Sequence, residues 1–301
     1  MDLNLVIDGH SVWLPAVVLL SLGVGLISGM FGVGGGFLLV PLLHVTLGVP
    51  VPAAVGVALC QTIATALGAL LRYRDMGHVE GRFDVMLLGG SLIGVDAGAR
   101  LLQLLSGGAT MTLFGRELLV MRVVVTVSYL VVFSIIAALL WWKPTPTAEA
   151  PRDPGPLARL RLPPYTRLPL AGVPRVSGPV IGFIGLANGI LAGLVGIGGG
   201  IILIPIMLYG FGFDIRKTAG TGIAVVLAVA IVGTVRHASL GNVHLGLAAT
   251  VMIGAALAAQ VGATLTRSLS ATTLRRALAL VMLATLVALM TKLFAGSAVA
   301  D

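Results

Sequence analysis

The sequence has little charge, few aromatic residues and almost no cysteine. Only 10% of its 301 residues are Asp, Glu, Lys or Arg, and 5% are aromatic. Soluble domains carry about 25% charged residues. Hydrophobic residues make up 57% of the chain, and the mean hydropathy is +1.07. A soluble protein could not hide this much apolar surface, so we expect the protein to lie in a lipid bilayer.

These scarcities also exclude several functions. A single cysteine, Cys60, can form neither an internal disulfide nor a cysteine metal site. No histidine and acid cluster has metal-ligand spacing, and the GxxxxGK[ST] phosphate loop of ATP-driven proteins is absent. The net charge of +8 comes from scattered basic residues rather than one stripe, which argues against nucleic-acid binding. No nucleophile lies near a base in the sequence, so we expect no enzyme, cofactor or metal.

The chain instead contains one pattern twice. Residues 25–41 read GLISGMFGVGGGFLLVP and residues 189–205 read GILAGLVGIGGGIILIP, with eight of 17 positions identical at an offset of 164. The same offset pairs Gly48 with Gly212 and Gly98 with Gly262. Duplicated apolar halves, each interrupted by glycine at the matching place, are typical of secondary transporters.

The apolar blocks predict an all-α polytopic membrane protein with two repeats. Repeat one occupies residues 1–142 and repeat two residues 178–301. In each repeat the first block is too long for one straight span and is broken by glycines. It predicts a broken helix or a helical hairpin, either fully crossing or re-entrant, followed by three spanning helices. The two blocks in question are residues 12–47 and 178–211.

A proline-rich, basic linker at 143–177 separates the repeats. Its prolines prevent regular helix, and Trp141 and Trp142 mark the membrane boundary before it. The positive-inside rule places this linker in the cytoplasm and both termini on the periplasmic side of the inner membrane. With this orientation, the other basic residues lie in different loops in the two repeats. This predicts that the two halves have opposite orientations in the membrane, that is, an inverted-topology repeat.

The glycine clusters are the strongest candidates for a substrate site. Backbone that leaves a helix inside a bilayer must be buried in protein or line a polar path. A broken helix exposes free N–H groups at a positive dipole end, and glycines let an anion touch them. We therefore predict a small anion between the two turns. The alternative is that the glycines only allow close helix crossings. The cluster residues are Gly32, Gly34, Gly35, Gly36, Gly196, Gly198, Gly199 and Gly200.

Neutral polar residues near these turns are further candidates. Any of them could bind a substrate oxygen, although Ser and Thr in membrane helices more often bond to their own backbone. They are Ser28, Gln61, Thr62, Asn188 and Thr221. His237 is placed by its sequence context in a solvated loop.

Four charged residues could serve coupling or gating. Asp96 lies inside an apolar block and could carry a coupling proton, or it could form a structural pair with Arg100, four residues later. Arg72 and Arg236 are related by the repeat. They could clamp or gate an anion, or reach to the lipid headgroups.

The paired G-[VI]-GGG-x₄-P motifs, the repeated halves and the basic linker resemble the TauE/SafE family of membrane permeases, or sulfite exporters. The resemblance covers nearly the whole chain except the linker, and it implies transport of sulfite, sulfonates or related small anions. It fixes neither the direction nor the coupling ion, a proton or sodium. A passive anion channel and a carrier of small carboxylates remain alternatives, an intramembrane enzyme is a distant one, and a homodimer is possible.

Overall fold

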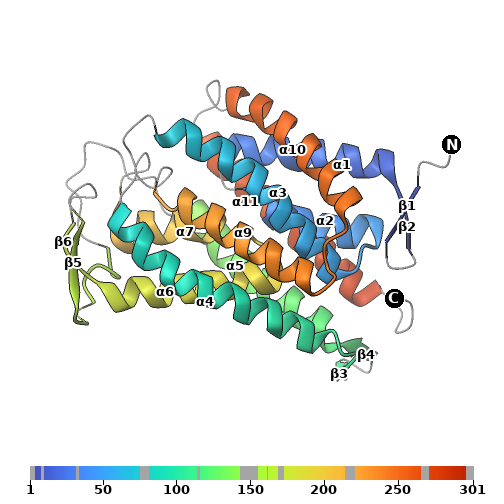
Figure 1. Cartoon of the computed structure of the whole chain (residues 1–301), viewed down its shortest axis with the longest axis horizontal. Coiled ribbons are helices and arrows are strands. Elements are labelled where there is room, and N and C mark those ends of the chain that lie inside the picture. The colour runs from blue at the N-terminus through green and yellow to red at the C-terminus, as the bar shows by residue number, and fades with distance from the viewer. Residues whose placement is uncertain are drawn as a thin grey trace.

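The computed structural model describes most of the chain, and everything below refers to those parts. They are residues 4–7, 10–31, 34–74, 81–113, 116–142, 155–160, 162–168, 173–213, 221–265 and 271–295. Six of the described helices are long and apolar enough to cross a membrane. The protein is therefore an all-α polytopic membrane protein (Figure 1).

The first half begins with a broken helix, as predicted. α1 (Leu14–Phe31) ends where the glycine cluster begins, and α2 (Gly36–Leu47) follows it. At about 1.5 Å per residue, the 12 residues of α2 extend only ~18 Å, while the bilayer core is ~30 Å thick. α2 therefore does not cross by itself. Three long helices complete this half: α3 (Val51–Arg74), α4 (Gly81–Leu105) and α5 (Val120–Trp142).

The second half repeats this order. α6 (Gly178–Val195) is followed after the second glycine cluster by α7 (Gly200–Pro205), which continues without a break as the π-helix η1 (Ile206–Phe211). Together α7 and η1 form one short apolar helical segment of the same length as α2. The remaining helices are α9 (Ile223–Ser239), α10 (Leu245–Leu265) and α11 (Ala271–Ala295). α9 has only 17 residues and is not among the six long candidates for spans.

Three antiparallel hairpins, which the sequence did not predict, connect or precede the helices. They are β1–β2 (Asn4–Ile7, His10–Trp13), β3–β4 (Thr110–Leu113, Arg116–Leu119) and β5–β6 (Tyr165–Leu168, Val173–Ser177). β5–β6 lies in the linker that separates the halves. Another part of that linker packs on η1, where the Leu157 N–H donates to the Gly210 carbonyl over 3.0 Å. The linker is thus partly attached to the membrane helices.

The two halves pack against each other through two equivalent pairs of helices. α1 lies against α10 of the other half, and α6 lies against α4. The close contacts repeat at the offset of 164. A Cβ at Gly29 would overlap the carbonyl oxygen of Ala259, and a Cβ at Gly193 would overlap that of Val95. These glycines let helix backbones meet directly, as small residues do in membrane interfaces.

The two halves begin at opposite ends of the molecule. Figure 1 shows the N- and C-termini at one end and the β5–β6 hairpin, which precedes α6, at the other. Large apolar side chains on the outer helix faces are exposed, including Ile93 (69%), Leu104 (77%) and Leu245 (81%). Such faces fit a bilayer, because lipid rather than water can cover them.

Candidate functional site

The first glycine turn joins α1 to α2. Gly34 has a left-handed φ of +77°, and Gly35 precedes α2 as its N-cap without any side-chain cap. Gly36 is the first residue of α2. The N–H groups at the start of α2 that have no partner inside the helix therefore point toward the turn, together with the positive end of the helix dipole.

The second turn has the same features, with more of its residues in the left-handed region. Gly196, Gly198 and Gly199 all have positive φ, between +71° and +81°. Gly199 is the N-cap of α7, again without a side-chain cap. An L-residue with a side chain rarely adopts this conformation, so glycine is required here for the backbone alone.

The two turns lie against each other. A Cβ added to Gly36 would meet the carbonyl oxygen of Gly196 at 2.5 Å. The side chain of Thr62, on α3, lies between them, because its atoms are the nearest neighbours of Gly34 and Gly198. Its hydroxyl already donates to the Ala58 carbonyl over 2.8 Å, so it is left as an acceptor rather than a donor.

Two buried carboxamides are directed at the turns, one at each. Gln61 on α3 is 0% exposed and faces Gly35, and Asn188 on α6 is 1% exposed and faces Gly199. A Cβ at Gly199 would lie 2.6 Å from the Nδ2 of Asn188. None of the four polar atoms of these two amides has a hydrogen-bond partner in the described chain. A buried unpaired amide is costly unless a partner is supplied, so these two side chains are the strongest candidates for contacting a ligand between the turns.

α5 holds both turns in place. The Tyr129 hydroxyl donates to the carbonyl oxygen of Val195, the last residue of α6, over 2.8 Å. The Phe133 ring packs edge-on against Phe37, next to Gly36, with centroids 6.1 Å apart. Tyr129 is fully buried and satisfies a carbonyl that the end of α6 leaves free. This role cannot be predicted from the sequence, because the partner of Tyr129 lies 66 residues away.

Tyr129→Phe is expected to destabilise the protein by about 1–2 kcal/mol, because a buried carbonyl loses its donor. It should also weaken anion binding, since the backbone at Val195, which leads into the second glycine turn, loses this hydrogen bond. Thermal unfolding and binding titration of the detergent-purified variant measure the two effects. Ser128→Ala serves as the control, because the Ser128 hydroxyl only bonds back to its own helix at Val124. An unchanged stability for Tyr129→Phe would contradict this role.

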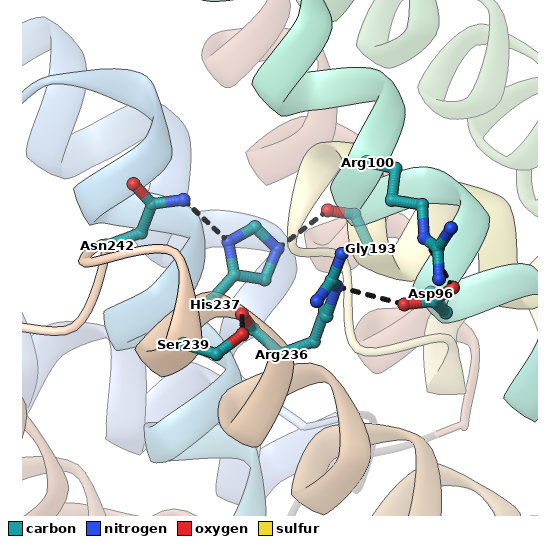
Figure 2. A network of polar contacts seen from close by, with 7 residues as sticks. All are labelled: Asp96, Arg100, Gly193, Arg236, His237, Ser239 and Asn242. Carbon is teal, nitrogen blue, oxygen red and sulfur yellow. Dashed lines mark hydrogen bonds and ion pairs between the residues drawn. The ribbon is translucent and has the colours of Figure 1, made fainter.

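Three of the four charged candidates, Asp96, Arg100 and Arg236, form a cluster between α4 and α9 (Figure 2). Asp96 Oδ2 lies 2.7 Å from Arg100 Nε, so the predicted pair within α4 exists. Its Oδ1 lies 2.9 Å from Arg236 Nε, a contact the sequence did not predict. The Arg236 contact is close but not aligned as a hydrogen bond. Arg236 therefore pairs with Asp96 across two helices instead of standing alone.

His237 corrects a sequence prediction. It is not in a solvated loop but within α9, and it is fully buried. Its Nε2 lies 2.9 Å from the carbonyl oxygen of Gly193 on α6, and its Nδ1 lies 3.3 Å from Asn242 Nδ2 (Figure 2). The carbonyl requires Nε2 to carry the proton, so Nδ1 accepts from the amide. His237 thereby connects α9 to the C-terminal end of α6, just before the second glycine turn.

Asp96→Asn is expected to leave the pH profile of transport unchanged and to lower stability by about 1 kcal/mol. The reason is that two guanidinium groups already engage this half-exposed carboxylate, and such pairs contribute roughly 0.2–1 kcal/mol each. Transport rates across a pH series and thermal unfolding check this expectation. A flattened pH profile would instead assign a coupling proton to Asp96.

The other predicted residues are more scattered. Ser28 is buried on α1. Thr221 is buried beside Gly222, whose N–H donates to Asp84 Oδ1 over 2.8 Å. Asp84 is a buried carboxylate that sequence reasoning missed, because it lies at the edge of its apolar block. Gly32 lies outside the described residues, as does the side chain of Arg72 in the last turn of α3.

Comparison with known proteins decides the family. The family model described as sulfite exporter TauE/SafE matches residues 17–289. The chain belongs to the TauE/SafE family. A curated relative, the probable membrane transporter protein YunE of Bacillus subtilis (strain 168), is 26% identical over 243 residues. That match covers 76% of this chain and 79% of the relative. No solved structure matches the chain. The family, the relative and the apolar helices together show that this TauE/SafE protein is a multi-pass membrane transporter and not an enzyme.

Proposed function

We propose that this TauE/SafE protein is a secondary transporter that moves a small sulfur oxyanion or organosulfonate across the inner membrane. The anion is held between the turn at Gly34–Gly36 and the turn at Gly198–Gly200. Alternating access would carry it, as one half moves against the other around this place.

One observation carries the proposal. Two helix N-termini without side-chain caps meet at the glycine turns, and two buried, unpartnered amides face them. Helix N-termini favour negative charge, and amide N–H groups donate to oxyanions. The sulfur chemistry is supported by the description of the family whose model matches the chain.

We infer that the halves have opposite orientation, with the linker in the cytoplasm and both termini outside. Two features support this: the halves begin at opposite ends of the molecule, and the linker is rich in arginine. Single cysteines introduced at Glu149 and Ser297 in a Cys60→Ser background test it. We expect an impermeant maleimide added outside intact cells to label Ser297→Cys, and to label Glu149→Cys only after permeabilisation. The reverse pattern would invert the assignment.

Counterflow in proteoliposomes tests the transport function. Vesicles preloaded with unlabelled methanesulfonate should accumulate labelled methanesulfonate, with a rate that saturates. A channel would dissipate the label without accumulation or saturation, and unlabelled acetate added as a competitor tests the carboxylate alternative. Imposed proton and sodium gradients then identify the coupling ion. Failure of every sulfur anion to exchange would contradict the proposal.

A further inference from the structure

Among the described residues, the nearest neighbours of the turn glycines include polar groups, and none of these neighbours is a charged side chain. The atoms that lie nearest to the described turn glycines are backbone atoms or belong to Gln61, Thr62, Asn188 and two valines. Among the described residues, the buried polar group includes Asp84 but no lysine or arginine. In the described part of the chain, no guanidinium or ammonium group is therefore among the nearest contacts of an anion held here.

Among these described contacts, the source of positive potential is the backbone. A helix N-terminus carries roughly half an elementary charge, so the ends of α2 and of the α7–η1 segment supply together about one. One negative charge on a ligand would be balanced by these two ends. A second negative charge would be buried without compensation, which is strongly unfavourable inside a protein.

The two amides add to this preference. Each has an N–H₂ group that can donate to an oxyanion and a carbonyl oxygen that can only accept. Oε1 of Gln61 and Oδ1 of Asn188 are buried and unpartnered, and the Thr62 hydroxyl already donates its hydrogen bond to the Ala58 carbonyl. These accepting oxygens repel further negative charge. Among the described contacts, the site thus offers few hydrogen-bond donors and no fixed cation.

We infer that the turn site selects singly charged oxyanions over doubly charged ones, and that Gln61 and Asn188 set this selectivity because they are neutral. The inference rests on the proposed function, since it describes the charge of the ligand that the same site accepts. A sulfonate or a singly protonated oxyanion fits, and sulfate does not.

Methanesulfonate and sulfate are the probes, because both are tetrahedral sulfur oxyanions, with three and four sulfur-bound oxygens respectively, and they differ by one charge. We expect the purified protein to bind methanesulfonate at least about tenfold more tightly than sulfate, which corresponds to about 1.4 kcal/mol. Gln61→Lys should narrow or reverse this ratio, because it adds the missing cation. Gln61→Met, of similar length but without hydrogen bonds, should weaken both ligands and leave methanesulfonate the more tightly bound of the two, because it adds no charge.

Gln61→Glu provides a variant of nearly unchanged shape if Gln61→Lys fails to fold. It should weaken both anions, and sulfate more than methanesulfonate. The inference would be overturned if the wild-type protein bound both probes with equal affinity. If Gly199→Val then lost the binding of both, the proposed function would remain intact. A ratio unaffected by Gln61→Lys or Gln61→Glu would also overturn the inference. Binding of neither probe would contradict the proposed function itself.

Discussion

Gly199→Val is expected to abolish anion binding while leaving the protein folded in the membrane. The φ of Gly199 is +81°, which a β-branched residue avoids. The added side chain would also displace Asn188, whose Nδ2 lies 2.6 Å from the position of the new Cβ. Loss of both the turn and the amide should weaken binding by about 100-fold or more, or roughly 3 kcal/mol.

Gly241→Val is the matched control. Gly241 has nearly the same φ, +78°, but nothing lies within 4 Å of a Cβ placed there. The backbone strain is therefore similar, while the turn site is untouched. Titration with methanesulfonate, followed by thermal shift, compares the two variants. If Gly199→Val retained its affinity, the turns would serve only for helix packing, the alternative interpretation of the glycine clusters.

Gly90→Leu is expected to prevent folding, whereas Gly89→Leu is tolerated. The two glycines are neighbours on α4, but they face different surroundings. A Cβ at Gly90 would overlap the carbonyl oxygen of Gly182 on α6, and a Cβ at Gly89 meets nothing within 4 Å. Separating two helix backbones should cost about 3 kcal/mol or more. Leucine at Gly89 should be neutral or slightly stabilising, because it forms helix better than glycine.

Membrane-inserted yield and the unfolding temperature of the two variants measure this difference. The position of Gly90 within the contact between α4 and α6 makes the effect a test of how the halves pack. Gly25→Leu, at the contact of α1 with Ala255 of α10, should behave like Gly90→Leu. Equal yields for Gly89→Leu and Gly90→Leu would show that α4 and α6 do not cross as described.

Much of the fold follows from the sequence because lipid imposes simple rules. Apolar blocks of sufficient length predict helices, and repeated glycines at one offset predict where both first helices break. The structure confirms both breaks, at the residues between α1 and α2 and between α6 and α7. The hairpins were missed, since short strands of four or five residues have no apolar period that separates them from loops.

The site could be predicted only in part, because its contacts join distant segments. Gln61 and Asn188 were selected as polar residues near the turns, but nothing in a sequence shows that both amides lack partners. Thr62 was correctly suspected of bonding to its own helix. The pairing of Arg236 with Asp96 and the burial of His237 against Gly193 cannot be read from the sequence, because these partners lie on other helices. In the sequence, nothing distinguishes Tyr129 from other aromatic residues in apolar helices, so its contact with Val195 cannot be predicted.

The most direct test is a cryo-electron microscopy map of the protein in lipid nanodiscs with saturating methanesulfonate, compared with a map without it. We expect ligand density between the turns at Gly34–Gly36 and Gly198–Gly200, within hydrogen-bond distance of Gln61 and Asn188. Density instead at Arg100 and Arg236, or ligand-free turns in a protein that is shown to bind methanesulfonate, would contradict the account.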